Sequence, residues 1–175
     1  MARITIPYAV ADFIDLRERG FYYVDKTDYI PKLEDYNAPV FLRPRRFGKS
    51  LLISTLEAYF LGKKELFEGL AMEKLEKDWI TYPIFHMDLN TEKYDTRESL
   101  DSILNFTLEK WEQQYGTAPS ETTFALRFRG LIERAYKQTG QRVVILIDEY
   151  DKPMLQAIGN EELQKEFRNT MKAFY

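Results

Sequence analysis

The stretch "PVFLRPRRFGKSLLISTLEAYF", at residues 39–60, predicts a strand, a loop and a helix in succession. An apolar run between two prolines at residues 39–44 is compatible with a buried strand. Apolar residues then recur at helical spacing over residues 49–61, and Gly62 follows as a stop signal. The triplet "GKS" stands where this helix begins. Because the first N–H groups of a helix have no partner inside it and its dipole favours an anion there, we expect an anion site at this turn.

The triplet matches the end of the phosphate-binding loop G-x-x-x-x-G-K-[S/T] but not its beginning, since Arg43 occupies the position of the first glycine. Gly48 allows the backbone to approach a phosphate closely, Lys49 can reach the β and γ phosphates, and the Ser50 hydroxyl can ligate magnesium. Loss of the first glycine removes conformational freedom only where the loop starts. The residues expected to hold the phosphates are Arg46, Phe47, Gly48, Lys49, Ser50 and Leu51.

Three arginines surround the start of the loop, and Pro44 stiffens it. Arg45 and Arg46 add positive charge that can steer a polyphosphate toward the site. The alternative interpretation is solvated charge on a surface loop. The sequence leaves open whether the side chain of Arg43, Arg45 or Arg46 contacts the nucleotide.

A second stretch, "RVVILIDEYD" at residues 142–151, is the strongest strand pattern in the chain. Its five consecutive apolar residues predict burial on both faces, as in a parallel sheet that helices cover. The strand ends in Asp148 and Glu149, at the end of a parallel strand where ligands bind. In such a position Asp148 can hold magnesium, and Glu149 can orient or deprotonate an attacking water.

The remaining segments alternate between strand and helix patterns. Residues 21–27 are β-branched and aromatic, which predicts a short strand or an extended arm. The helix expected at residues 28–36 has Thr27 or Asp28 as its cap and Pro31 in its first turn, where a missing N–H costs little. This alternation predicts an α/β fold with a mainly parallel sheet flanked by helices. The further expected elements are a strand at residues 82–90 and helices at residues 97–115, 122–139 and 161–175.

The bulk composition is that of a folded domain. Of 175 residues, 45% are hydrophobic and 30% are charged, which excludes a disordered chain. The net charge of -3 gives no global attraction to nucleic acid or to an anionic membrane. The absence of cysteine excludes disulfides and thiolate metal sites. No apolar run approaches the roughly 18 residues of a membrane span, so we expect a cytoplasmic protein.

Three segments together resemble a known family. In this order, "YYVDKTDYI", "FLRPRRFGKSLLISTL" and "ILIDEYDKP" are similar to the bacterial AAA-ATPase-like proteins, which often carry a PD-(D/E)XK nuclease-type domain at the C-terminus. The resemblance covers nearly the whole chain. It implies a P-loop NTPase fold. In that fold residues 48–50 would contact the phosphates and the metal, and Asp148 and Glu149 would be the acidic pair. Replacement of the first loop glycine is usual in that family. The resemblance therefore implies that Arg43 is compatible with a working loop.

We expect one domain over residues 1–175, with an N-terminal arm and helix at residues 1–38 and a nucleotide-binding core at residues 39–175. By analogy with P-loop ATPases, a sensor strand should follow the acidic strand and lie between it and the loop strand. Residues 154–175 have a helical pattern instead, so we expect the chain to be the N-terminal part of a longer protein. An arginine finger, if one is used, would come from the missing part or from a neighbouring subunit of a homo-oligomer.

These patterns predict a magnesium-dependent ATPase, with Lys49 on phosphate, Ser50 and Asp148 on magnesium, and Glu149 polarising water. The alternative is a regulatory or interaction module that binds ATP without turnover and controls an attached nuclease-type domain. A small-molecule or nucleotide kinase is less favoured, because the acidic pair suits water activation. A DNA-binding module is the least supported, since the chain is acidic; nucleic acid would be reached only indirectly.

Other residues have a functional and a structural interpretation. Residues 22–25 precede the loop strand, where related ATPases pack a segment against adenine, but strand packing is favoured. His86, the only histidine, is interpreted as a core residue and not as a metal ligand. Asp88 ends a strand and can face magnesium, although a strand-end cap or a solvated acid is favoured. The remaining interpretations are structural: a helix cap for Asp151, a surface charge for Lys152, and packing for Trp79 and Trp111.

Overall fold

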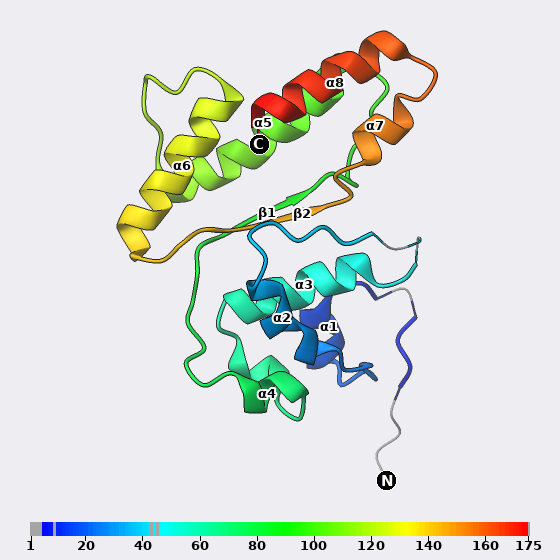
Figure 1. Cartoon of the computed structure of the whole chain (residues 1–175), viewed down its shortest axis with the longest axis vertical. Helices are drawn as coiled ribbons and strands as arrows, with labels where there is room; N and C mark the ends of the chain where they lie inside the picture. The colour runs from blue at the N-terminus through cyan, green and yellow to red at the C-terminus, as the bar shows by residue number, and fades with distance from the viewer. Residues whose placement is uncertain (1–4, 9, 43, 45, 175) are drawn as a thin grey trace. The chain divides into compact units, whose positions relative to one another are not determined.

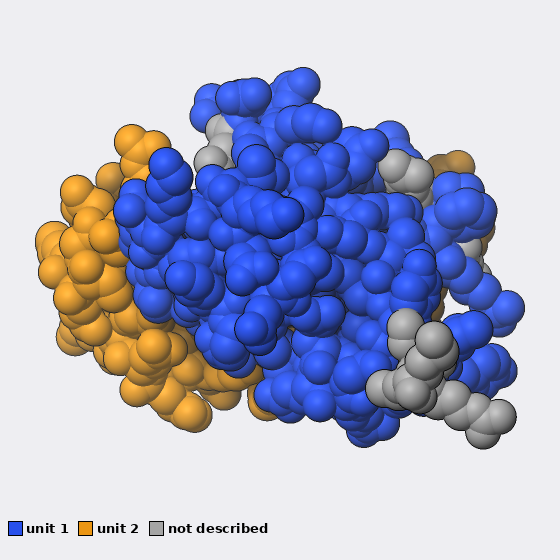
Figure 2. Space-filling model, turned by 90° about the horizontal axis from the view of Figure 1, so that it is seen from below, with its two compact units in different colours: residues 1–84 blue, residues 85–175 orange. Residues whose placement is uncertain are grey.

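The computed structural model describes residues 5–8, 10–42, 44 and 46–174. The chain divides into two compact units, Met1–Ile84 and Phe85–Tyr175, which Figure 2 colours separately and which we call the first unit and the second unit. Arg43 and Arg45 lie outside the described residues, so a contact of either side chain with a nucleotide stays a question for experiment. The single domain expected over residues 1–175 stays a prediction.

Figure 1 follows the elements in chain order. The elements up to the end of the first unit are α1 (Phe13–Glu18), the 3₁₀ turn η1 (Thr27–Tyr29), α2 (Ile30–Glu34), α3 (Lys49–Phe60), the 3₁₀ turn η2 (Lys64–Phe67) and α4 (Ala71–Leu75). The chain continues with β1 (Ile84–Asp88), α5 (Arg97–Tyr115), α6 (Phe124–Thr139), β2 (Val144–Asp148), α7 (Lys152–Gln156) and α8 (Glu161–Phe174).

The long helices are confirmed where their apolar periodicity predicted them, as α3, α5, α6 and α8. The helix expected at residues 28–36 is confirmed as α2, with Pro31 in its first turn, but its expected cap is wrong. Tyr29 stands at the N-cap of α2 and makes no side-chain cap bond. The Thr27 hydroxyl is used elsewhere, because it donates to Asp25 and accepts from the N–H of Met72.

In the first unit, α1 packs against α3 through a buried serine. Ser54 of α3 accepts a hydrogen bond of 2.8 Å from the N–H of Phe13, and its hydroxyl also lies 3.3 Å from the carbonyl of Ala11. The Phe13 ring is fully buried and meets the rings of Tyr23 and Phe67 at centroid distances of 5.1 and 5.0 Å. The bonds of Ser54 anchor the middle of α3 to the start of α1.

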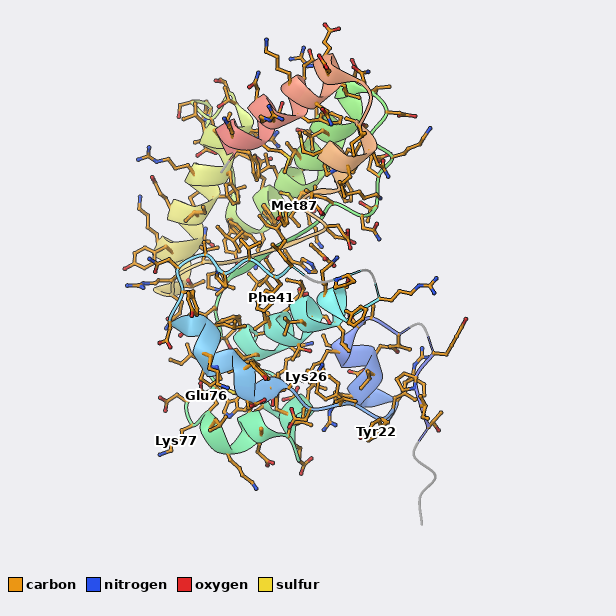
Figure 3. The ribbon with its side chains drawn as sticks, turned by 45° about the vertical axis from the view of Figure 1, so that its right-hand side comes forward. Tyr22, Lys26, Phe41, Glu76, Lys77 and Met87 are labelled. Atoms are coloured by element: carbon orange, nitrogen blue, oxygen red, sulfur yellow. The ribbon has the colours of Figure 1, made fainter. Side chains whose placement is uncertain are left out.

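The prediction of a strand at residues 39–44 is wrong for those of its residues that the structure describes. Residues 39–42 have no regular secondary structure, and Val40 and Leu42 are 65% and 78% exposed. Figure 3 labels Phe41, which lies on this connection ahead of α3. An apolar run becomes a strand only when a neighbouring strand satisfies its backbone groups. The two-stranded sheet of the described residues contains β1 and β2 alone.

In the second unit, β1 and β2 pair in parallel, which confirms an α/β structure with a small parallel sheet flanked by helices. Figure 1 shows α5, α6 and α8 together on one face of this sheet. Phe85 and Met87 of β1 are buried in the core beneath these helices, and Met87 is labelled in Figure 3. The Phe85 ring stacks on that of Trp111 in α5, with centroids 4.4 Å apart. Packing of aromatic side chains therefore holds the helical layer on the sheet.

The expected burial of the acidic strand on both faces is confirmed only in part. In β2 the side chain of Ile145 is 42% exposed and that of Ile147 is half-buried, whereas Leu146 and Asp148 are buried. A strand reaches full burial when it lies between other strands and under helices on both faces. Within the described residues β2 pairs with β1 alone, so it is the edge of a small sheet.

Two ion pairs with little exposure join α6 to its surroundings. Arg127 reaches Glu112 of α5 with two bonds of 2.7 and 2.8 Å and also donates to Asn105 at 2.5 Å. Arg134 pairs with Glu121 in the connection before α6, and this pairing lowers the pKa of the Glu121 carboxyl. Gly130 leaves room for the Glu121 carboxylate, because a Cβ at position 130 would lie 1.7 Å from one of its oxygens.

Replacing Arg127 with methionine should destabilise the second unit by roughly 2–4 kcal/mol, because Glu112 would keep a charge that is only 11% exposed without its bidentate partner. Arg129→Met is the matched control on the same helix. Its ion pair with Glu133 is 78% and 54% exposed, so the loss should be about 0.5 kcal/mol or less. Urea unfolding of both variants measures the difference. Equal losses would show that the Arg127 network adds nothing beyond a surface ion pair.

Candidate functional site

The loop before α3 has an unusual backbone. Gly48 is the N-cap of α3 with φ of 75°, and Arg46, two residues earlier, has φ of 67°. Phe47 between them does not have a positive φ. Left-handed residues so close together in a loop can turn neighbouring N–H groups toward one point, which makes a concave site for an anion. For Arg46 this conformation costs about 1–2 kcal/mol, a strain that is typical of binding loops.

The start of α3 adds to this anion site. Its first intrahelical bond runs from the N–H of Leu52 to the carbonyl of Gly48, at 3.0 Å. The N–H groups of the first turn therefore point to partners outside the helix. Lys49 and Ser50 open the helix and are half-buried, while Phe47 is 65% exposed. A Cβ on Gly48 would meet no atom within 4 Å, so it is the backbone conformation and not the space that favours glycine here.

The acidic pair lies at the carboxyl end of the sheet in the second unit. Asp148 is the last residue of β2 and 8% exposed, and Asp88 is the last residue of β1 and exposed. The N–H of Leu89 donates to the carbonyl of Asp148 at 3.1 Å, so the two strand ends are direct neighbours. Side chains alternate along a strand. Because Met87 and Ile147 pack into the helical core, Asp88 and Asp148 face away from it.

Glu149 follows Asp148 in a left-handed conformation, with φ of 51°. Its N–H donates to the Asp148 carboxylate at 2.9 Å, and its carbonyl accepts from the N–H of Lys152 at 3.0 Å. A tight turn therefore begins directly after the strand end, at Glu149.

The segment of residues 22–25 has a structural task. The Asp25 carboxylate accepts from the N–H and hydroxyl of Thr27 and from the N–H of Ala71, at 2.9, 2.8 and 2.7 Å. It thereby holds the first turn of α4. Tyr23 is half-buried on the ring of Phe13. These contacts agree with the favoured interpretation, packing; an adenine contact is not tested and stays a prediction.

Replacing Asp25 with alanine should cost about 1 kcal/mol of stability, the usual effect of removing a helix cap. Burial raises the pKa of Asp25, but its hydrogen bonds outweigh burial and hold that pKa below its ordinary value. The contribution is therefore present above the ordinary pKa and is lost as the pH falls through the folded value. The gap in melting temperature between the two proteins should be widest near pH 7 and should narrow as the pH falls below about 4. Asp28→Ala, an exposed acid 4.0 Å from Lys32, is the control with little effect at any pH; a gap that stays constant as acid is added contradicts this account.

The other interpretations have mixed outcomes. His86 is half-buried in the middle of β1, and the Trp111 and Trp79 rings pack against other aromatic rings as expected. The expected strand-end cap is confirmed for Asp88, which accepts from the N–H of Asn90 at 2.8 Å. Asp151 stands at the N-cap of α7 but makes no side-chain cap bond.

Lys152 is not the surface charge that the sequence predicted. Its ammonium donates to the backbone carbonyls of Asn90 and Glu92, at 2.5 and 3.0 Å. Sequence reasoning missed it because its partners are main-chain atoms some 60 residues away, which no side-chain pattern reveals.

The structure thus groups residues 46–51 in the first unit and Asp88, Asp148 and Glu149 in the second. Nowhere in the described ranges do three or more His, Asp or Glu side chains form a group that could hold a metal ion. In the part of the chain that the structure describes, no helix combines the length and apolar character that crossing a membrane requires.

Comparison with known proteins adds the family. The family described as predicted AAA-ATPase matches residues 7–175. The chain belongs to this family. Membership confirms the resemblance and indicates nucleotide binding and hydrolysis as the class of function of this AAA-ATPase-like chain.

A relative of the AAA-ATPase-like chain is an uncharacterized protein in the vnfD 5' region of Azotobacter chroococcum mcd 1, 35% identical over 178 residues. The match covers 100% of this chain and 34% of the relative, so the chain spans about a third of that protein's length. No solved structure matches the chain.

Proposed function

We propose that this AAA-ATPase-like chain binds ATP with magnesium at residues 46–51 and hydrolyses it with the acidic end of β2. The observation that carries the proposal is the left-handed backbone of Arg46 and Gly48 directly before α3, a helix of 12 residues. Such a turn gathers backbone N–H groups, and the helix dipole adds positive potential at the same point. A polyphosphate has the charge that suits this site.

The residues that follow the turn supply the specific contacts. Lys49 comes directly after Gly48, where its ammonium binds the β and γ phosphates as a point charge. The Ser50 hydroxyl and the Asp148 carboxylate are oxygen ligands of the kind that magnesium prefers. Magnesium is usually held by one or two carboxylates together with substrate phosphates, and it neutralises charge on them. The strand end at Asp148 fits this role because its carboxylate faces away from the helical core.

Glu149 is the proposed base. It stands one residue beyond Asp148, in the left-handed conformation that starts the turn after β2. A carboxylate in this position orients the attacking water and accepts its proton. The proposal thus assigns binding to the loop and turnover to the acids, the two roles that a P-loop NTPase combines.

The second candidate function is a module that binds ATP without turnover and controls an attached effector. It is favoured by one observation: the loop and the acidic pair belong to separate compact units, and binding uses chiefly the loop. A nuclease-type domain as that effector, assembly into a homo-oligomer and a cytoplasmic location are part of the proposal, on the basis of the resemblance. Contact with nucleic acid would occur only through the attached domain.

Steady-state phosphate release separates the two candidates. The ATPase proposal expects release that requires magnesium and saturates with ATP. Saturable ATP binding without release above that of buffer would instead support the regulatory module. If the folded chain showed no ATP binding and no phosphate release, both candidates would be contradicted.

A further inference from the structure

The ammonium of Lys152 joins two loops at the carboxyl end of the sheet. Lys152 opens α7, yet its Nζ donates to the carbonyls of Asn90 and Glu92 in the loop after β1, at 2.5 and 3.0 Å. The same Nζ lies 5.8 Å from the centroid of the Tyr94 ring, within the range of a cation–π contact. The side chain as a whole is half-buried. A charged donor with two backbone acceptors makes stronger bonds than a neutral one.

Two more hydrogen bonds fasten the same segments. The N–H of Tyr94 donates to the side-chain carbonyl of Gln156 in α7, at 2.8 Å. The Tyr94 hydroxyl donates to the carbonyl of Leu89 at 2.8 Å, and its ring is 1% exposed. We call this set the clasp: Lys152 and Gln156 from α7, with loop residues 89–94. Through it, the start of α7 is anchored to β1 as well as to β2.

The clasp is linked to Glu149 through a backbone hydrogen bond. The N–H of Lys152 donates to the carbonyl of Glu149 at 3.0 Å, which closes a four-residue turn. Glu149 itself has φ of 51°, a conformation that residues with a Cβ adopt only when their surroundings hold them in it. One side of the turn is fixed by the bond from Glu149 N–H to the Asp148 carboxylate. The other side ends at Lys152, whose position the clasp determines.

We infer that Lys152 is a positioning residue that acts through Glu149. Its ammonium holds the turn of residues 149–152 against the loop after β1 and so keeps Glu149 left-handed. The backbone conformation in turn sets the direction of the Glu149 carboxylate. The consequence for turnover rests on the proposed function, in which Glu149 orients the attacking water. The conformational part is a property of the second unit alone.

Lys152→Met is the test, since methionine keeps an unbranched side chain but has no donor for the carbonyls of Asn90 and Glu92. Lys152→Arg restores charged donors on a longer, planar group and should rescue in part. Lys165→Met, at an exposed position on α8, is the matched control. Two readouts are needed: the kcat and KM for ATP, and the Cα and Cβ chemical shifts of Glu149, which report its backbone conformation.

We expect Lys152→Met to lower kcat about tenfold with KM within about twofold, and to shift the Glu149 signals toward extended backbone. Lys165→Met should change neither. If Lys152→Met leaves the Glu149 signals in place, the inference is overturned, whatever happens to kcat. If the wild type has no turnover, the proposed hydrolysis fails, and the Glu149 signals alone decide whether the clasp holds the turn. Should Lys152→Met fail to fold, Gln156→Ala opens the clasp by a milder change, since it removes the acceptor of the Tyr94 N–H, and Glu149 signals that stay in place in that variant would overturn the inference.

Discussion

Replacing Lys49 with alanine is expected to weaken binding of magnesium-ATP by about 10- to 100-fold, which corresponds to roughly 1.5–3 kcal/mol. The loss is large because the ammonium adds a full charge at the start of α3, where the backbone supplies only dipoles. The backbone of Arg46 and Gly48 is left unchanged by this substitution, so weak residual binding should persist. Calorimetry or displacement of a fluorescent nucleotide measures the difference.

The control for Lys49→Ala is Lys77→Ala, an exposed lysine of the same unit that is labelled in Figure 3. It removes the same charge far along the chain from the loop, so ATP affinity should stay within about twofold at 0.15 M salt. Equal losses in both variants would mean that the nucleotide responds only to net charge, and the loop would then have no specific role.

Replacing Glu149 with glutamine is expected to lower the rate of phosphate release by about 100-fold or more while ATP affinity is retained. Glutamine preserves the shape of the side chain but cannot accept the proton of water. The N–H bond of residue 149 to the Asp148 carboxylate involves the backbone and should survive. The separation of rate from affinity is therefore the specific signature of a base.

Glu162→Gln, an exposed acid at the start of α8, is the matched control and should release phosphate at the wild-type rate. If Glu149→Gln turns over ATP as fast as this control, Glu149 is not the base. The proposal would then keep ATP binding and lose its account of hydrolysis.

The helices were predictable because their information is local. Leu100, Leu104, Leu108 and Trp111 recur at helical spacing in the sequence, and each is buried in α5. The same holds for α8, where Leu163, Phe167 and Phe174 are buried on one face. The strands β1 and β2 were also predictable, although the structure makes both shorter than the apolar and alternating segments suggested.

The strand expected at residues 39–44 shows the limit of local patterns. Val40 and Leu42 have the composition of a strand, but strand formation depends on a partner that lies elsewhere in the sequence. The expectation that Ile145 is buried was wrong for the same reason. Five apolar residues indicate which side chains a strand could bury, but not which elements cover that strand. Both errors arise because the sheet of the described residues has fewer strands than the sequence patterns suggested.

The candidate site was predictable in its side chains and not in its backbone. The order of "GKS" and "DE" identified Gly48, Lys49, Asp148 and Glu149 as candidates from chemistry alone. The left-handed conformation of Arg46 and Glu149 was not foreseen, since neither residue type favours it. Contacts with backbone carbonyls, such as those of Lys152, leave no pattern in a sequence either.

The most direct test of the central claim is a calorimetric titration of ATP with magnesium into the wild-type chain, with Lys49→Ala alongside. We expect saturable binding near one nucleotide per chain in the wild type and a loss of about 10- to 100-fold in the variant. Binding of equal strength in both proteins, or none in a wild-type chain that circular dichroism shows to be folded, would contradict a nucleotide site at the loop of residues 46–51.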